Sequence, residues 1–425
     1  MELIDFFTGA RFGMFIHFGL YSVAGGLWHG RESRRNRYAD WIKYQANWPS
    51  PEPSADAEYD ALAAGLTLER FDAEQWVQEA ENAGMKYLVF TAKHHDGFAL
   101  YDSRVSDYNI RRQTPFGRDL LRELVDACRR HGILPGAYYS HWLDWRHPGG
   151  GRPQWPEIPE DPVIEQPSDE DFEVYFQEKC LAQVTELLDD YGIRLFWFDN
   201  WCRTPLLTDD RIDRLAALVH SRGGIVNSRI GATWNHSLGD GAAIDYLSMG
   251  DNQFPDHLIE RPWETSGTGN DSWGFHRLDD HWKSGGELLR CLIANASRNG
   301  NYQLNVGPLP DGTFPVPAVR QLREIGRWMK TNGQSIYHTV GAPYQAPEHT
   351  LLTQSRDGRT LYAHVLSPLA GNELLLRDLA RPVGCCRLTA TRRELPFRTA
   401  GNRLSITLPP AGGIVEPMVV ELEFQ

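Results

Sequence analysis

The chain has 425 residues and a formal net charge of −13, with no block of basic residues, so nucleic acids and anionic membranes are poor partners for it. Hydrophobic residues make up 41% of the chain and charged residues 23%, which is typical of a globular protein. No apolar run is long enough to cross a bilayer, and the first residues lack the layout of a signal peptide. We therefore expect a globular protein in the cytoplasm.

Short apolar runs alternate with amphipathic segments through most of the chain. Predicted strands cover residues 13–20, 86–96, 133–140, 195–199, 225–229, 244–251 and 302–306; predicted helices cover residues 71–84, 118–131, 169–191, 209–221, 283–297 and 316–331. Such alternation indicates a parallel sheet, either a closed barrel or an open doubly wound sheet. Polar residues end one strand after another, and a closed barrel brings such ends to one rim. We therefore predict an α/β fold, a (β/α)8-like TIM barrel, over residues 1–337.

The composition changes near residue 337. All 14 Trp residues lie between Trp28 and Trp328, and the segments 359–366, 372–377 and 403–408 are short, strand-like and separated by Pro and Gly. This pattern predicts a small C-terminal all-β sandwich over residues 338–425. Residues 146–167 carry six of the 26 prolines, so we expect a surface loop over the barrel mouth there.

Asp199 is the first candidate for chemistry, because it ends the apolar run L-F-W-F at residues 195–198. A carboxylate at the rim end of a strand can act as a nucleophile, and the alternative role is an N-cap of the following helix.

The second candidate is the pair His94 and His95, followed by Gly97. Neighbouring residues of a strand face opposite ways, so we expect one ring to point into the barrel and the other sideways. The pair could bind sugar hydroxyls, could ligate a metal together with His17, or could be structural.

The third candidate is the segment 250–264, predicted as a loop after a strand, which carries Asp251, Asp256 and Glu264 beside aromatic residues. A carboxyl group against apolar surface has a raised pKa, which suits a general acid; the alternative is a solvated acidic loop. Two carboxylates on a barrel rim, with many Trp side chains to pack on sugar rings, suggest glycoside hydrolysis.

Several ordered motifs sharpen this hypothesis. They include F-I-H-F-G at residues 15–19, K-H-H-D-G at 93–97, Y-Y-S at 138–140, W-F-D at 197–199, W-E at 263–264 and N-Y-Q-L-N-V-G-P at 301–308. With these motifs the chain resembles glycoside hydrolase family 29, the α-L-fucosidases, over roughly residues 10–340. The resemblance implies the same barrel and sandwich, and hydrolysis that retains anomeric configuration through a covalent glycosyl-aspartate.

The resemblance also implies roles for single residues. Asp199 matches the nucleophile, His17, His94 and His95 match residues that bind sugar hydroxyls, and Arg229 matches a sugar-site arginine, although V-N-S-R replaces the usual V-N-D-R. A tyrosine near the nucleophile is either Tyr138 or Tyr139, and an active-site tryptophan is either Trp28 or Trp41. Trp197 and Trp263 are expected close to the same chemistry.

The resemblance offers two candidates for the acid/base, because the position of this residue varies within the family. Members of the family often have the sequence G-D-x-x-T-P-E where this chain has G-D-N-Q-F-P-D at residues 250–256. The register makes Asp256 the first choice for the acid/base, and Glu264 is the second choice.

We therefore predict a retaining exo-glycosidase that hydrolyses α-L-fucosides of small-molecule carbohydrates, with no cofactor and no metal; self-association is left open. One alternative is a related substrate such as an α-L-galactoside, since an apolar wall rejects an added hydroxyl weakly. A fucose-binding protein with impaired catalysis is another. A third is a metal-dependent hydrolase with His17, His94, His95 and Asp199 as ligands.

Overall fold

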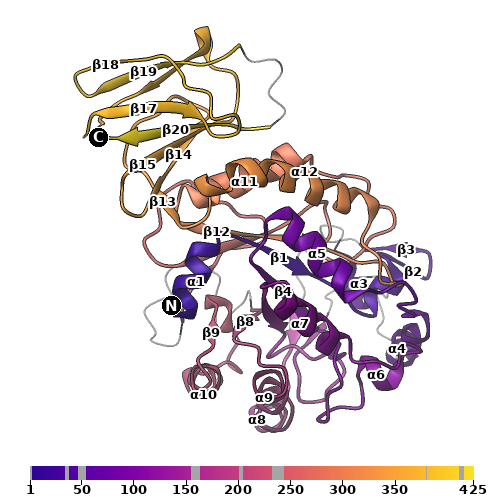
Figure 1. The fold of residues 1–425 in the computed structure, drawn as a ribbon. Helices are drawn as coiled ribbons and strands as arrows, with labels where there is room; N and C mark the ends of the chain where they lie inside the picture. The colour runs from indigo at the N-terminus through magenta and orange to yellow at the C-terminus, as the bar shows by residue number, and fades with distance from the viewer. Residues whose placement is uncertain are drawn as a thin grey trace.

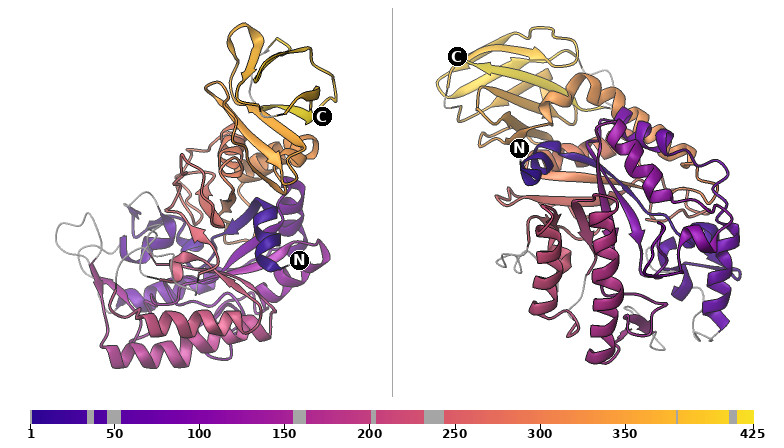
Figure 2. Two further views of the ribbon diagram at one scale, coloured as in Figure 1. Left: turned by 90° about the vertical axis from the view of Figure 1, so that its left-hand side faces the viewer. Right: turned by 60° about the horizontal axis from the view of Figure 1, so that its bottom comes forward.

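The computed structural model describes residues 2–33, 38–45, 54–154, 163–200, 204–231, 244–379, 381–410 and 416–425. It has two parts (Figures 1 and 2): a barrel of parallel strands with helices around it, and antiparallel sheets formed by the C-terminal residues. In the described ranges no helix combines the length and apolar character needed to span a bilayer.

Eight parallel strands form one sheet in the order β10-β11-β12-β1-β4-β5-β8-β9. Their bounds are β1 Phe12–Ile16, β4 Tyr87–Lys93, β5 Leu134–Tyr139, β8 Leu195–Phe198, β9 Ile225–Val226, β10 Leu247–Ser248, β11 Trp263–Thr268 and β12 Gly300–Val306. Asn227, directly after β9, forms a parallel bridge with Tyr246, directly before β10. This bridge joins the two ends of the sheet, so the strands follow one another in chain order around a closed barrel, as predicted.

Long helices lie outside the strands. They are α5 Ala73–Ala83, α7 Leu120–Arg130, α8 Asp169–Tyr175, α9 Ala182–Asp189, α10 Asp209–His220, α11 Gly285–Ala296 and α12 Val316–Asn332. Local sequence sets their ends: the Asp72 side chain accepts from the backbone N–H groups of Glu74 and Gln75 at the start of α5, and Gly84 ends that helix at φ 88°. The predicted helix 169–191 contains a π-helical turn, η3 Phe176–Leu181, between α8 and α9.

Shorter elements complete the barrel part. They are α1 Leu3–Ala10, α2 Tyr21–Ala24, β2 Leu27–Trp28, β3 Arg31–Glu32, η1 Ala39–Trp41, α3 Ile42–Gln45, α4 Ser54–Asp60, η2 Ala61–Gly65, α6 Ile110–Gln113, β6 Arg152–Gln154, β7 Val163–Glu165, η4 Ser228–Ile230 and η6 Gly333–Ser335. β6 and β7 pair within the predicted loop 146–167, and residues 155–162 of that loop lie outside the described residues.

One predicted loop is wrong. Trp263 and Glu264 lie on β11, which pairs with β10 and β12, and not in a loop. The strand was missed because its sequence, W-E-T-S-G-T, contains few apolar residues although all six are buried. Hydrophobic periodicity does not detect a barrel strand whose side chains are largely polar.

The C-terminal part contains a five-stranded antiparallel sheet, β13-β14-β15-β20-β17, and a three-stranded sheet, β16-β19-β18. The bounds are β13 Thr339–Gly341, β14 Thr350–Ser355, β15 Thr360–Val365, η7 Ala370–Asn372, β16 Glu373–Leu376, β17 Val383–Leu388, β18 Phe397–Ala400, β19 Arg403–Thr407 and β20 Met418–Phe424. Leucines from both sheets share one hydrophobic core. The predicted boundary at residues 337/338 falls between the end of α12 and the start of β13.

A buried ion cluster supports the barrel mouth. The carboxylate of Asp144 lies 3.3 Å from Lys93 Nζ and 2.7 Å from Lys179 Nζ, and all three side chains are buried. The same carboxylate accepts the backbone N–H of His147 at 2.9 Å. The backbone N–H of Trp145, the next residue after Asp144, donates to the carbonyl of His95 at 2.8 Å. The cluster thus fixes the loop that holds His95.

Replacing Asp144 should therefore destabilise the fold. Asp144→Ala leaves two buried ammonium groups without their carboxylate, and we expect a loss of about 3–5 kcal/mol in the free energy of unfolding. Urea unfolding of Asp144→Ala measures this, with Asp126→Ala as the control because Asp126 pairs with Arg129 at the surface and should cost less than about 0.5 kcal/mol. Equal effects of the two substitutions would contradict the structural role of the cluster.

Candidate active site

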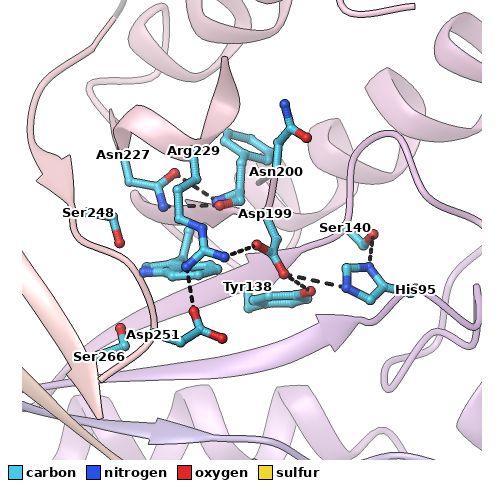
Figure 3. A network of polar contacts seen from close by, with 12 residues as sticks. His95, Tyr138, Ser140, Asp199, Asn200, Asn227, Arg229, Ser248, Asp251 and Ser266 are labelled. Carbon is cyan, nitrogen blue, oxygen red and sulfur yellow. Dashed lines mark hydrogen bonds and ion pairs between the residues drawn. The ribbon is translucent and has the colours of Figure 1, made fainter. Parts of the chain in front are cut away.

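Polar side chains from five neighbouring strand ends meet at one end of the barrel (Figure 3). His95 follows β4, Tyr138 lies near the end of β5, Asp199 follows β8, Arg229 lies in η4 after β9, and Asp251 follows β10. This is the carboxyl end of the strands, where barrel enzymes carry their active sites.

Asp199 lies at the centre of this group. Tyr138 Oη donates to Asp199 Oδ2 at 2.8 Å, and Arg229 Nη2 lies 2.8 Å from Asp199 Oδ1. The amide of Asn227 pairs with both backbone groups of Phe198, at 3.0 Å each, and so fixes the residue before Asp199. Burial raises the pKa of Asp199, while the positive charge of Arg229 and the hydrogen bond from Tyr138 oppose this rise.

Arg229 connects two carboxylates. Its Nη1 lies 2.9 Å from Asp251 Oδ1, while Nη2 faces Asp199, and its guanidinium stands 4.7 Å from the ring centroid of Trp197. Burial alone would lower the pKa of Arg229, but the two carboxylates raise it above its usual value. Asp199 and Asp251 are thus held side by side on one guanidinium, as Figure 3 shows.

The structure distinguishes the two tyrosines. Tyr138 faces into the barrel and stacks on Trp197, with ring centroids 5.4 Å apart. Tyr139 faces the opposite way, and its hydroxyl donates to Gln183 Oε1 on α9 at 2.8 Å. The alternation of side chains along β5 therefore brings Tyr138, and not Tyr139, to Asp199.

Both histidines of the pair face the site, so the expectation that one points sideways is wrong. The physical reason is that β4 ends at Lys93, and the strand alternation ends with it. His95 Nε2 lies 3.5 Å from Asp199 Oδ2, and the ring of His94 stacks on Tyr138 at 5.2 Å. Burial lowers the pKa of both imidazoles well below the usual value.

His17 lies on the same side of the barrel. Its ring is 5.7 Å from Tyr138 and 5.0 Å from Trp273, and its Nδ1 lies 2.7 Å from Asn305 Oδ1. Burial lowers its pKa to about 4, so the imidazole is neutral near pH 7.

Two of the four predicted tryptophans lie at the site and two do not. Trp41 lies at the site, with its ring 5.3 Å from His95, and Trp197 forms its floor beneath Arg229. Trp28 packs on Tyr59 in the core, so Trp41 and not Trp28 fits the active-site tryptophan. Trp263 packs with Leu247 and Met249 on the outer face of β11 and does not reach the site.

Glu264, the second choice for the acid/base, lies beneath the site. Its Oε1 accepts from Trp197 Nε1 at 2.5 Å and from Ser248 Oγ at 3.4 Å. Its Oε2 is buried and has no hydrogen-bond partner among the residues that the structure describes. Burial raises the pKa of Glu264 to about 8, as a general acid requires, but the residue is only 1% exposed. A leaving-group oxygen does not reach this carboxyl.

Asp256, the first choice, lies outside the group of residues around Asp199. Its side chain is 96% exposed and contacts His257 at 3.0 Å, and this neighbour lowers the pKa of Asp256. The connection from β10 to β11 explains this placement, because it runs along the outside of the barrel toward the amino ends of the strands. The backbone N–H of Ile259 donates to the carbonyl of Arg298, which precedes the amino end of β12.

The site contains two further acidic residues to which the sequence assigned no role of their own, Asp251 and Asp40. Asp251 Oδ2 accepts from Trp273 Nε1 at 3.2 Å. Asp40 lies 3.8 Å from His94 Nε2, and burial raises its pKa to about 7. Asp251 and its partner Trp273 could have been found from the sequence, because Asp251 ends a predicted strand and Trp273 belongs to the motif D-S-W-G at residues 271–274. Asp40 has no comparable local signal.

The four side chains considered as metal ligands do not gather around one point. Among the described residues, the one group of three whose donor atoms all lie within 4.8 Å is Asp271, Asp279 and His281. His17, His94, His95 and Asp199 form no such group, so the geometry gives the metal-hydrolase alternative no support.

A carboxylate pair among aromatic side chains at the carboxyl rim of a (β/α)8-like barrel defines a class of protein, the glycoside hydrolases. The family model described as alpha-L-fucosidase matches residues 1–334. The chain belongs to the α-L-fucosidase family, glycoside hydrolase family 29, and the predicted resemblance is confirmed.

Sequence and structure comparisons agree. The chain is 30% identical to the plasma alpha-L-fucosidase of Rattus norvegicus over 428 residues, covering 96% of this chain and 86% of the relative. It is similar to the alpha-L-fucosidase isoenzyme 1 from Paenibacillus thiaminolyticus, with a TM-score of 0.83, 30% identity and coverage of 99% and 98%. A family 29 α-L-fucosidase from Bacteroides thetaiotaomicron, solved as a trapped covalent intermediate with 2-fluoro-fucosyl fluoride, has a TM-score of 0.86 and 26% identity, with coverage of 99% and 95%.

The raised pKa of Glu264 predicts a pH dependence of stability. An unfolded glutamate has a pKa of about 4.3, so between about pH 5 and pH 8 the folded state keeps a proton that the unfolded state has lost. The stability contributed by this proton is present at low pH and is lost as the pH rises through the folded pKa of about 8. Glu264→Gln keeps the acceptor for Trp197 and removes the titration.

We therefore expect Glu264→Gln to gain stability relative to the unmodified protein as the pH rises from 5 to 8. The measurement is the thermal midpoint of both proteins across this range. Glu123→Gln, on the surface helix α7, is the control and should run parallel to the unmodified protein. A difference between Glu264→Gln and the unmodified protein that does not change with pH would contradict the protonated state of Glu264.

Proposed function

We propose that this protein is a retaining exo-α-L-fucosidase in which Asp199 is the nucleophile and Asp251 is the acid/base. The observation that carries the proposal is the carboxylate pair on Arg229, at the mouth of a barrel lined by aromatic side chains. The covalent intermediate trapped in the Bacteroides thetaiotaomicron relative supports the same two-step route for this chain.

The nucleophile must be ionised and must reach the anomeric carbon. Arg229 and Tyr138 place positive charge and a hydrogen-bond donor on the two oxygens of Asp199, which favours the carboxylate over the acid. In the first step Asp199 attacks the anomeric carbon and the aglycone leaves with a proton. In the second step water cleaves the fucosyl–Asp199 ester and releases fucose.

Asp251 fits the acid/base better than Asp256 or Glu264. Its side chain is 28% exposed, so a substrate oxygen can reach it, and the guanidinium of Arg229 holds it next to the nucleophile. Retaining glycosidases keep their two carboxyl groups about 5–5.5 Å apart, a spacing that suits two carboxylates on neighbouring nitrogens of one guanidinium.

Asp251 transfers a proton in each step of the proposed mechanism. In the first step it donates the proton that leaves with the aglycone. In the second step, when Asp199 is a neutral ester, it accepts a proton from the attacking water. The two transfers return Asp251 to its starting form, so one residue serves as the acid and then as the base.

Neutral histidines and flat rings suit a neutral sugar. His17, His94 and His95 offer hydrogen bonds to hydroxyl groups, and Trp41, Tyr138 and Trp197 offer apolar faces for the C–H side of the ring. A location in the cytoplasm and self-association stay predictions, which cell fractionation and a measurement of mass in solution would test.

The nucleophile is tested by Asp199→Gly. We expect the rate of aryl α-L-fucoside hydrolysis to fall by about 1000-fold or more, because no covalent intermediate forms. Added azide should restore turnover from the face that Asp199 has vacated, so the product should be β-L-fucosyl azide. Hydrolysis that continues unchanged, or an α-configured azide, would overturn the assignment of Asp199.

The acid/base is tested by comparing Asp251→Asn, Asp256→Asn and Glu264→Gln. Asp251→Asn should lower kcat/KM for a fucoside with a poor leaving group by about 100-fold or more, and much less for a dinitrophenyl fucoside. Azide should then yield α-L-fucosyl azide, since it attacks the intermediate without a general base. If Asp256→Asn or Glu264→Gln shows this pattern instead, Asp251 is not the acid/base.

A further inference from the structure

Two histidines of the site each form a hydrogen bond with a polar side chain. That side chain donates a further hydrogen bond to a backbone carbonyl. The first is His17, whose Nδ1 lies 2.7 Å from Asn305 Oδ1. Asn305 Nδ2 donates to the carbonyl of Trp273 at 2.7 Å. A carbonyl only accepts, so this bond fixes the amide with its NH2 group toward Trp273 and its oxygen toward His17. Nδ1 of His17 must therefore carry the proton.

The second is His95, whose Nδ1 lies 2.7 Å from Ser140 Oγ. Ser140 Oγ donates its single proton to the carbonyl of Leu143 at 2.9 Å. The hydroxyl oxygen is then an acceptor toward His95, so Nδ1 of His95 also carries the proton. Figure 3 shows Ser140 at one nitrogen of this ring and Asp199 facing the other.

We propose that Asn305 and Ser140 are positioning residues that hold His17 and His95 as hydrogen-bond acceptors toward the sugar. With Nδ1 protonated, a neutral imidazole keeps its lone pair on Nε2. The site then recognises substrate hydroxyl groups as donors at two places. This inference rests on the proposed function, because it specifies how the same site reads its sugar.

Burial supports the neutral state of both rings. Asn305 and Ser140 are themselves buried, at 4% and 0% exposure, so water does not compete for their bonds. The pKa of each histidine is lowered because burial disfavours the imidazolium. A charged ring would donate from both nitrogens and would lose the acceptor role.

The acceptor nitrogen of His95 lies close to the proposed nucleophile. Its Nε2 is 3.5 Å from Asp199 Oδ2, which accepts the hydroxyl of Tyr138 at 2.8 Å. A substrate hydroxyl that donates to Nε2 is therefore held next to the carboxylate that attacks the anomeric carbon.

The inference is tested with fucose derivatives that each lack one hydroxyl donor. Free L-fucose and its monodeoxyfluoro derivatives, in which fluorine replaces one hydroxyl at a time, are measured as competitive inhibitors of aryl fucoside hydrolysis. We expect at least two positions at which fluorine weakens binding about 5- to 10-fold. In Asn305→Leu the penalty at one of these positions should fall below about twofold, while the other penalties stay.

Asn301→Leu is the matched control. Asn301 lies on the same strand β12 as Asn305, is buried, and donates from Nδ2 to the carbonyl of Phe7 at 2.8 Å. Its variant should keep every fluorine penalty of the unmodified protein. Ser140→Ala should reduce the penalty at a different position from Asn305→Leu, and Ser140→Thr, which keeps the hydroxyl, should restore it. A merely structural role would weaken all the sugars alike.

A spectroscopic measurement on the unmodified protein does not depend on any variant's folding. With 15N-labelled histidine, His17 and His95 are assigned by loss of their signals in His17→Gln and His95→Gln. We expect a protonated Nδ1 and an unprotonated Nε2 in both rings. A protonated Nε2 in either ring, or penalties unchanged in Asn305→Leu and Ser140→Ala, would overturn the inference.

Failure of the proposed function can be distinguished from failure of this inference. In that case the unmodified protein neither hydrolyses an aryl α-L-fucoside nor binds fucose, and the nitrogen spectra alone then decide whether Asn305 and Ser140 fix the two rings.

Discussion

The active site depends on one buried cation, the guanidinium of Arg229. Charge at this depth is stable only when opposite charge compensates it, and Arg229 has Asp199 on one nitrogen, Asp251 on another and the face of Trp197 beneath. These partners come from the ends of β8 and β10, on either side of the β9 end that supplies Arg229. The geometry of the carboxylate pair therefore follows from the closure of the barrel between β9 and β10.

The same cation explains why the site has two layers. One guanidinium already faces two carboxyl groups, so a third ionised carboxyl nearby would be without compensation. Glu264 is the third, and it resides below Trp197 with its pKa raised to about 8. In its protonated form it serves as an uncharged acceptor for the indole N–H of Trp197. The charged groups Arg229, Asp199 and Asp251 thus lie on one side of the Trp197 ring, and Glu264 on the other side orients that ring through its hydrogen bond.

Local signals in the sequence were sufficient for the architecture. Helix α5 could be predicted because Asp72 and Gly84 mark its two ends, and Asp199 because an apolar strand ends at it. The failures share a physical cause, since each depends on contacts that residues far apart in the chain make. β11 has polar inward side chains, which are acceptable only because the barrel interior pairs them. The orientation of His94 and His95 depends on the residue at which β4 ends.

The acid/base shows the same limit most clearly. Matching G-D-N-Q-F-P-D to a family motif places Asp256 by counting residues, but the count does not say which way the connection after β10 runs. Because that connection descends along the outer layer toward Arg298, a residue five positions after Asp251 leaves the rim. The sequence indicated Arg229 as a site residue, but it could not show that the guanidinium of Arg229 contacts both Asp199 and Asp251.

Charge balance explains why this pair suits a neutral substrate. The proposed mechanism requires Asp251 to carry a proton before reaction, and in that form the charges of Arg229 and Asp199 cancel. As the glycosidic bond breaks, Asp251 loses its proton and becomes negative while the sugar ring gains positive charge, because the transition state resembles an oxocarbenium ion. In the covalent intermediate the ester is neutral, and Arg229 then balances Asp251. Along the proposed reaction the summed charge of Arg229, Asp199, Asp251 and the sugar therefore stays zero, so no step requires an uncompensated charge to be created away from water.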